Sequence, residues 1–260
     1  MTSKLNFIIF ALATLTGIAV RTVMLIFTVE PLNGFIKPEY SVVSAFIIAF
    51  LIVAAALIFL SSLFAKTQED ATPAIKGKFF SVVCIVMAAA IIYETFFGDL
   101  LVFSSKLQTS LQYLFAAVAA ASLVYIGVCK FIGKDFPDAL SIAPILFWGM
   151  RLIIVFTEFS TISTISDTAI ETAGMCLTLI TVMMYAKTEC MQEIKHKNLY
   201  FATSLTAGYV YLLGSVPRII SQYILNAGSI HLDTVPAYTA LAAAIFSIVY
   251  GYTFYASVKK

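Results

Sequence analysis

The sequence has 260 residues, of which 61% are hydrophobic and only 12% are charged, with a mean hydropathy of +0.97. Soluble domains are about half apolar and about a quarter charged, so this composition excludes an ordinary soluble domain and indicates an integral membrane protein. The net charge of +2 is too small to indicate a nucleic-acid partner.

Eight apolar segments follow one another along the chain, and each has about the 20 residues that a membrane-spanning helix needs. We predict spans at roughly 6–29, 41–65, 79–103, 107–132, 139–160, 165–186, 199–225 and 235–257. No small-residue cleavage site follows the first segment, which we interpret as a retained helix rather than a signal peptide. The predicted fold is an all-α integral membrane protein with eight transmembrane helices, in a single polytopic membrane domain, 1–260.

The positions of the lysines predict the orientation of the chain. Eleven lysines lie on one side of the predicted spans, namely Lys4, Lys66, Lys76, Lys78, Lys130, Lys134, Lys187, Lys195, Lys197, Lys259 and Lys260. Only Lys37 and Lys106 lie on the other side. Because cytoplasmic loops carry an excess of Lys and Arg, we expect both termini in the cytoplasm and the protein in the cell membrane.

Similar segments recur in the two halves of the chain. Tyr113 to Tyr125 resembles Tyr238 to Tyr250, and further matches recur at offsets of 121 to 130 residues. Four spans in each half would keep both halves in the same orientation. We therefore predict a four-plus-four parallel internal repeat, with pseudo-repeats 5–132 and 138–257 and a shared site at their interface.

Charged residues interrupt several of the apolar segments, and we predict that six of them form a ligand-binding site. They are Arg21, Glu94, Arg151, Glu158, Glu171 and Arg218. A charge at mid-bilayer costs about 3 kcal/mol or more, so such residues face the interior of the bundle and have partners. With cytoplasmic termini, all six lie in the outer half of the membrane.

Local spacing refines this prediction. Arg151 and Glu158 are about two helical turns apart and are expected on one helix face. Pro217 directly precedes Arg218, which predicts a kink or an unwound turn there. Tyr93, Tyr209 and Tyr211 lie in the same spans and are candidates for the lining of a cavity.

Two interpretations of the charges remain open. The arginines and carboxylates either lock helices together or line an outward-facing cavity for a small ligand, in which the arginines bind an anionic group. The four cysteines and two histidines have no metal-ligand spacing, and we predict neither a metal nor a cofactor.

Three functional classes follow. The first is a secondary transporter or permease component for a small anionic or zwitterionic solute. The second is a non-catalytic membrane subunit or sensor, which would work with a membrane-protein partner or a second copy. The third, a membrane-embedded enzyme acting on lipid, ranks last because the sequence has no nucleophile or metal motif of known type.

Overall fold

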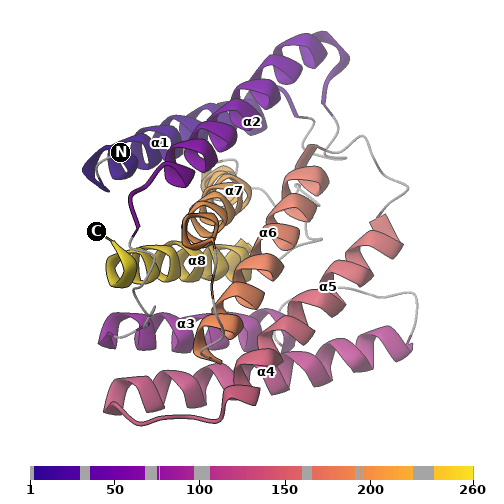
Figure 1. The fold of residues 1–260 in the computed structure, drawn as a ribbon. Helices are drawn as coiled ribbons and strands as arrows, with labels where there is room; N and C mark the ends of the chain where they lie inside the picture. Colours follow the sequence, from indigo (N-terminus) through magenta and orange to yellow (C-terminus); the bar gives the residue numbers. More distant parts are fainter. Residues whose placement is uncertain are drawn as a thin grey trace.

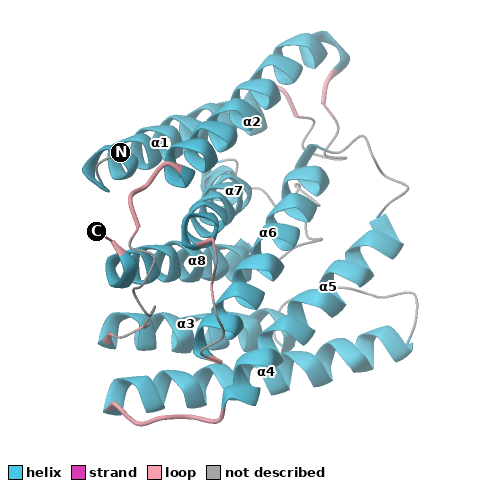
Figure 2. Cartoon of the chain, viewed as in Figure 1, coloured by secondary structure: helices cyan, strands magenta, loops and turns pink. Residues whose placement is uncertain are grey.

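The computed structural model describes residues 3–29, 36–67, 75, 77–96, 106–159, 166–190, 194, 196–224 and 237–259. These residues form eight long helices with no strands among them (Figures 1 and 2). The helices are α1 (Ser3–Phe27), α2 (Ser41–Leu63), α3 (Lys78–Phe96), α4 (Lys106–Ile132), α5 (Ala143–Phe159), α6 (Ser166–Glu189), α7 (Lys197–Ile224) and α8 (Ala237–Val258). Short 3₁₀ helices, η1 (Pro38–Tyr40) and η2 (Asp138–Ile142), lead into α2 and α5.

All eight helices are long and apolar enough to cross a membrane, which confirms the predicted all-helical, multi-pass architecture. The predicted boundaries agree with the helix ends to within a few residues, except that α3 ends at Phe96 and residues 97–105 lie outside the described part. Gly133 ends α4: its φ of +77° lets the Lys134 amide donate to the Cys129 carbonyl at 2.9 Å.

Helix α7 lies at the centre of the bundle, where it packs against α1, α2, α6 and α8 (Figure 1). In its span 72% of the residues are buried by protein, against 22% in α2. Close contact with α8 requires glycine at position 208, because a Cβ there would collide with the side chain of Ile248. Since its surroundings are protein rather than lipid, α7 can carry polar residues on several faces.

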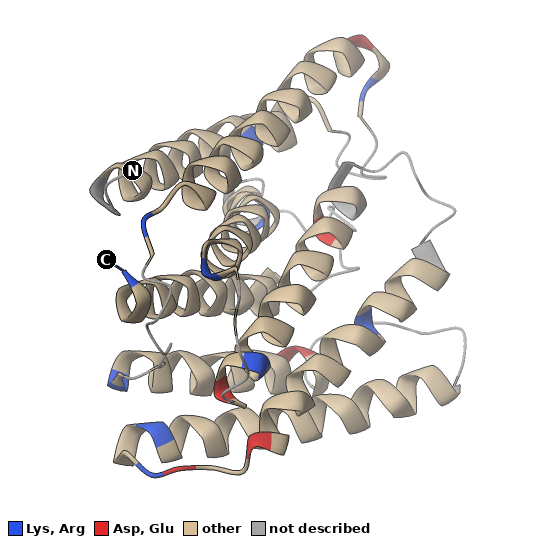
Figure 3. Cartoon of the chain, viewed as in Figure 1, with Lys and Arg blue, Asp and Glu red and all other residues tan. Residues whose placement is uncertain are grey.

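Both chain termini lie at the same end of the bundle (Figure 1). Thr67, just after α2, forms an isolated bridge with Lys259, just after α8, and its hydroxyl donates to Asn198 Oδ1 at the start of α7. Most of the Lys and Arg residues that Figure 3 colours blue also lie at this end. That this end faces the cytoplasm stays a prediction.

The helix contacts bear on the predicted internal repeat. Within each half the packing corresponds, since α1 contacts α2 as α5 contacts α6, and α3 contacts α4 as α7 contacts α8. Between the halves, α7 packs against α1 and α2, whereas the corresponding contacts of α3 with α5 and α6 are absent among the described residues. The repeat therefore stays a prediction from sequence similarity, and the packing between the halves is asymmetric.

Candidate functional site

Five of the six predicted site residues have described side chains, and all five are buried: Arg21, Glu94, Arg151, Glu171 and Arg218. The sixth, Glu158, lies in α5, but its side chain is outside the described part of the structure, so its expected pairing with Arg151 stays a prediction. Burial of five ionisable groups inside membrane-spanning helices carries a cost of several kcal/mol unless their charges compensate one another.

Glu171 on α6 and Arg218 on α7 form an ion pair, with Oε2 and Nη2 separated by 3.7 Å. Arg151 and Glu94 are close enough for their charges to act on Glu171, and Arg21 is close enough to act on Arg218. The structure therefore brings the five described residues into one electrostatic cluster. They come from five different helices, α1, α3, α5, α6 and α7.

Arg151 contributes a buried cation from α5 to this cluster. Its side chain is 3% exposed, and its Nε and Nη2 have no hydrogen-bond partner among the described residues. Its guanidinium carbon lies 6.0 Å from the ring centroid of Trp148, one turn earlier on α5. A cation over an aromatic face is stabilised by about 0.5–2 kcal/mol, which does not replace the missing hydrogen bonds.

Two further polar atoms, on α5 and α6, lack hydrogen-bond partners among the described residues: the Trp148 indole nitrogen and Glu171 Oε1. The Tyr211 hydroxyl of α7 interacts with the Thr178 side chain of α6 and with the charges of Arg151 and Glu171. The Tyr211 and Trp148 rings are 5.9 Å apart. A donor and an acceptor without described partners therefore lie where α5, α6 and α7 meet.

A small, partly open cavity adjoins the ion pair. It has a volume of about 10 Å³ and is lined by residues of α6, α7 and α8, including Glu171, Tyr211, Gly214, Ser215 and Arg218. That volume is about the minimum needed for one water molecule. In the described conformation the cavity is therefore too small for an organic solute.

Glu94 has a defined structural partner. Its two carboxylate oxygens accept hydrogen bonds from the backbone amides of Tyr238 and Thr239, at 2.7 and 2.8 Å. These amides lie in the first turn of α8, where backbone N–H groups lack partners within the helix and the helix dipole is positive. Glu94 on α3 thus caps α8, a contact that the sequence analysis did not predict.

The described helix α7 runs without interruption through Pro217, so the unwound turn that we predicted before Arg218 is not present. Proline still lacks the amide that would donate to the Leu213 carbonyl one turn earlier. Gly214, next to that carbonyl, lines the small cavity. The local effect of Pro217 is therefore one lost helical hydrogen bond beside the site, rather than a broken helix.

The three candidate tyrosines have three different surroundings. Tyr211 belongs to the cluster, as described above, whereas Tyr209 lies on the opposite side of α7, where its hydroxyl donates to the Leu51 carbonyl of α2 at 3.4 Å. Tyr93 is 55% exposed on the outside of α3. The sequence analysis does not select Trp148 as a candidate. The feature that could have identified it is its position, because it is the only tryptophan of the chain and lies one turn before Arg151.

The structure also shows a second, partly buried ion pair at the end of the bundle that carries the termini. Lys130 Nζ of α4 lies 2.8 Å from Glu189 Oε1 of α6 and donates to the Ile75 carbonyl at 3.0 Å. The Phe80 and Phe136 ring centroids are 5.8 and 5.4 Å from the same Nζ. In the sequence, Lys130 is only one of the eleven lysines that predict the orientation, because the sequence does not show that Glu189 lies beside it.

Among the described residues, no group of three or more His, Cys, Asp or Glu residues is placed to hold a metal ion. Comparisons of the chain with protein-family models, with curated proteins and with solved structures found no match. The chemistry of the buried cluster is therefore the basis for assigning a function.

Proposed function

We propose that this multi-pass membrane protein is a secondary transporter, or a membrane component of one, that binds a small anionic or zwitterionic solute at the Arg151 cluster. The observation that carries the proposal is the guanidinium of Arg151, which is buried among membrane-spanning helices and has two nitrogen atoms without a hydrogen-bond partner among the described residues. Intramembrane charges of this kind mark ligand or ion pathways.

The charge of the cluster favours an anionic group. Its described members are three arginines and two carboxylates, and Glu94 already gives both oxygens to the backbone of α8. A carboxylate or phosphate of the solute would compensate the excess positive charge. It would also accept hydrogen bonds from the N–H groups of the planar Arg151 guanidinium.

The atoms around Arg151 also favour a zwitterion over a simple anion. Within the described part of the chain Glu171 Oε1 has no hydrogen-bond partner and could accept from a solute ammonium group, while the Tyr211 hydroxyl could donate or accept. A solute with one group of each sign would therefore satisfy both Arg151 and Glu171.

Binding requires a movement of the helices, because the cavity beside the Glu171–Arg218 pair has a volume of only about 10 Å³. Helix α5 is the best candidate for this movement, since among the described residues it packs only against α4, α6 and η2, whereas α7 packs against four helices. Displacement of α5 from α6 would widen the space between Arg151 and Glu171, as alternating access at a shared site requires.

The test is a thermal-stability screen of the purified protein in detergent with amino acids, dicarboxylates and phosphate, repeated for Arg151→Met. A ligand that binds only the folded state raises the free energy of unfolding, and therefore the melting temperature. At 100 times its dissociation constant the gain in free energy is about 2.7 kcal/mol. We expect at least one compound to stabilise the wild type and Lys134→Met, an exposed control, but not Arg151→Met. The same compound should then be taken up by proteoliposomes.

A specific observation also supports the structural interpretation, since the Glu171–Arg218 pair directly joins α6 to α7. If the cluster is only a clamp, Glu171→Gln should destabilise by about 3–5 kcal/mol, and replacement of both residues by methionine should restore most of that loss. Recovery by the double variant, together with a wild type that no compound stabilises, would exclude the transporter proposal.

A further inference from the structure

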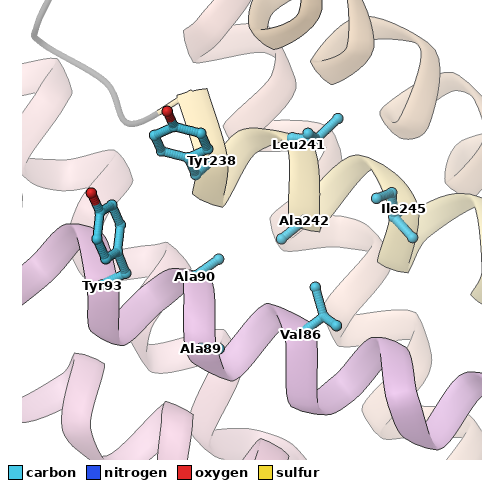
Figure 4. Close-up of a pocket in the computed structure, with 8 residues that line it drawn as sticks. All are labelled: Val86, Ala89, Ala90, Tyr93, Tyr238, Leu241, Ala242 and Ile245. Atoms are coloured by element: carbon cyan, nitrogen blue, oxygen red, sulfur yellow. The ribbon is translucent and has the colours of Figure 1, made fainter. Parts of the chain in front are cut away.

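An open groove runs between α3 and α8 on the outside of the bundle. Its volume is about 430 Å³, and Figure 4 shows its lining. The lining residues are Val86, Ala89, Ala90, Tyr93, Tyr238, Leu241, Ala242 and Ile245. Apart from the two tyrosine hydroxyls, all of these side chains are apolar, so the groove offers a hydrocarbon surface to its occupant.

The groove opens towards the membrane. Val86, Tyr93 and Tyr238 are about half exposed, at 46%, 55% and 49%, and both helices are membrane spans. The medium outside such helices is the hydrocarbon of the bilayer. Water would not fill an apolar groove of this kind.

Hydrogen bonds between α3 and α8 hold one end of the groove in place. Besides the two amide contacts of Glu94, the Thr239 hydroxyl donates to the Ala90 carbonyl at 3.3 Å. Further along, the small side chains of Ala89, Ala90 and Ala242 leave space that larger side chains would fill. The groove is thus preorganised, which lowers the entropic cost of binding.

The length of the groove suits part of one extended acyl chain. From Val86 to Tyr93 the groove follows about 10 Å of α3, which is less than one leaflet of a hydrocarbon core that is about 30 Å thick. An acyl chain that runs along this part of α3 therefore stays within one leaflet.

Two tyrosines mark one end of the groove. The Tyr93 and Tyr238 rings meet edge to face with centroids 5.9 Å apart, and Figure 4 shows their hydroxyls directed away from the Val86 and Ile245 end. Tyrosine is enriched at the level of lipid headgroups, where the ring contacts hydrocarbon and the hydroxyl contacts polar groups.

We infer that the groove between α3 and α8 binds an acyl chain of a bilayer phospholipid, whose headgroup lies against the hydroxyls of Tyr93 and Tyr238. The chain fills the space above Ala89, Ala90 and Ala242. This lipid site is separate from the Arg151 cluster and does not depend on the proposed transport activity.

The test reconstitutes the full chain in phosphatidylcholine vesicles that contain a small fraction of phosphatidylcholine with a photoactivatable diazirine in one acyl chain. After illumination, adducts are mapped by peptide mass spectrometry. We expect adducts on the groove residues of α3 and α8 to exceed those on the exposed face of α2 by roughly tenfold, a ratio that corresponds to about 1.4 kcal/mol. Equal labelling of both surfaces would overturn the proposal.

Variants then test whether the groove itself is responsible. Ala89→Phe and Ala242→Phe each place a ring in the groove, whereas Ala117→Phe places the same ring on the exposed face of α4. We expect the first two to reduce the α3 and α8 adducts roughly tenfold and the control to leave them unchanged. Undiminished adducts in groove variants that melt like the wild type would refute lipid binding in the groove.

Discussion

The carboxylate of Glu94 acts on α8 as a capping side chain does, but it acts from a neighbouring helix. Both of its oxygens are used, by the amides of Tyr238 and Thr239. Arg151 presents the opposite case, because two of its nitrogen atoms have no hydrogen-bond partner among the described residues. This difference agrees with the proposal that Arg151 contacts the solute, and it suggests a framework role for Glu94.

Glu94→Gln tests this assignment. The amide keeps one acceptor oxygen but turns an NH₂ group towards the second backbone N–H, so we expect a loss of about 1–3 kcal/mol in the free energy of unfolding. Thermal unfolding in detergent measures it, with Glu39→Gln in the exposed η1 as the matched control. A Glu94→Gln protein that melts like the wild type but no longer responds to the stabilising solute would instead place Glu94 in the ligand site.

Residue spacing along α7 separates what could be predicted from what could not. Tyr209 and Tyr211 are two residues apart, about 200° around a helix, so the sequence alone indicates that they face different sides. It does not indicate which side faces α6, because that depends on how α7 is rotated against its four neighbours. Only the packing shows that Tyr211 joins the cluster while Tyr209 contacts α2.

Close packing of α7 against α8 depends on glycine at position 208 of α7. A Cβ at residue 208 would meet the Ile248 side chain and would lie 3.2 Å from the Ala244 carbonyl oxygen. At Gly149 on α5, by contrast, an added Cβ would meet nothing within 4 Å. The same substitution is therefore predicted to destabilise the protein at position 208 but not at position 149.

We expect Gly208→Ala to destabilise the protein by about 1–3 kcal/mol, because overpacking pushes α8 away from α7. Gly149→Ala should change the free energy of unfolding by no more than about 0.5 kcal/mol. Thermal melting of both purified variants gives the comparison. Equal effects at the two positions would show that the α7–α8 contact is looser than described.

The Lys130–Glu189 pair joins α4 to α6 at the end that carries the termini. Its side chains are only 10% and 12% exposed, so removal of one partner leaves a poorly solvated charge. We predict that Lys130→Met and Glu189→Gln each lower the melting temperature, and that the double variant loses less than the two single losses combined. A double-mutant cycle should give a coupling of about 0.5–3 kcal/mol, and zero coupling would contradict a direct pair.

For the molecule as a whole, the even number of spans places both termini at one end, and the lysines predict that this end is cytoplasmic. Single cysteines in a background that lacks Cys84, Cys129, Cys176 and Cys190 test this. In intact cells we expect an impermeant thiol reagent to label Glu39→Cys but not Lys66→Cys or Lys259→Cys. The reverse pattern would invert the orientation, and different results for the last two would contradict the eight-span topology.

The number, positions and approximate ends of the eight spans follow from the sequence alone. Bilayer thickness imposes a length on every apolar segment, so each span can be recognised without knowledge of its neighbours. The cost of intramembrane charge likewise singles out the buried ionisable residues, because this cost depends on residue type and depth rather than on a particular partner.

Only the tertiary structure decided which side chains meet. Glu94 and Tyr238 are 144 residues apart in sequence, and Lys130 and Glu189 are 59 apart. Such contacts depend on helix rotation and on the order of helices in the bundle, and lipid-facing and protein-facing apolar surfaces look alike in sequence because lipid chains are as apolar as leucine. For the same reason, the central place of α7 and the groove between α3 and α8 could be found only in the assembled bundle.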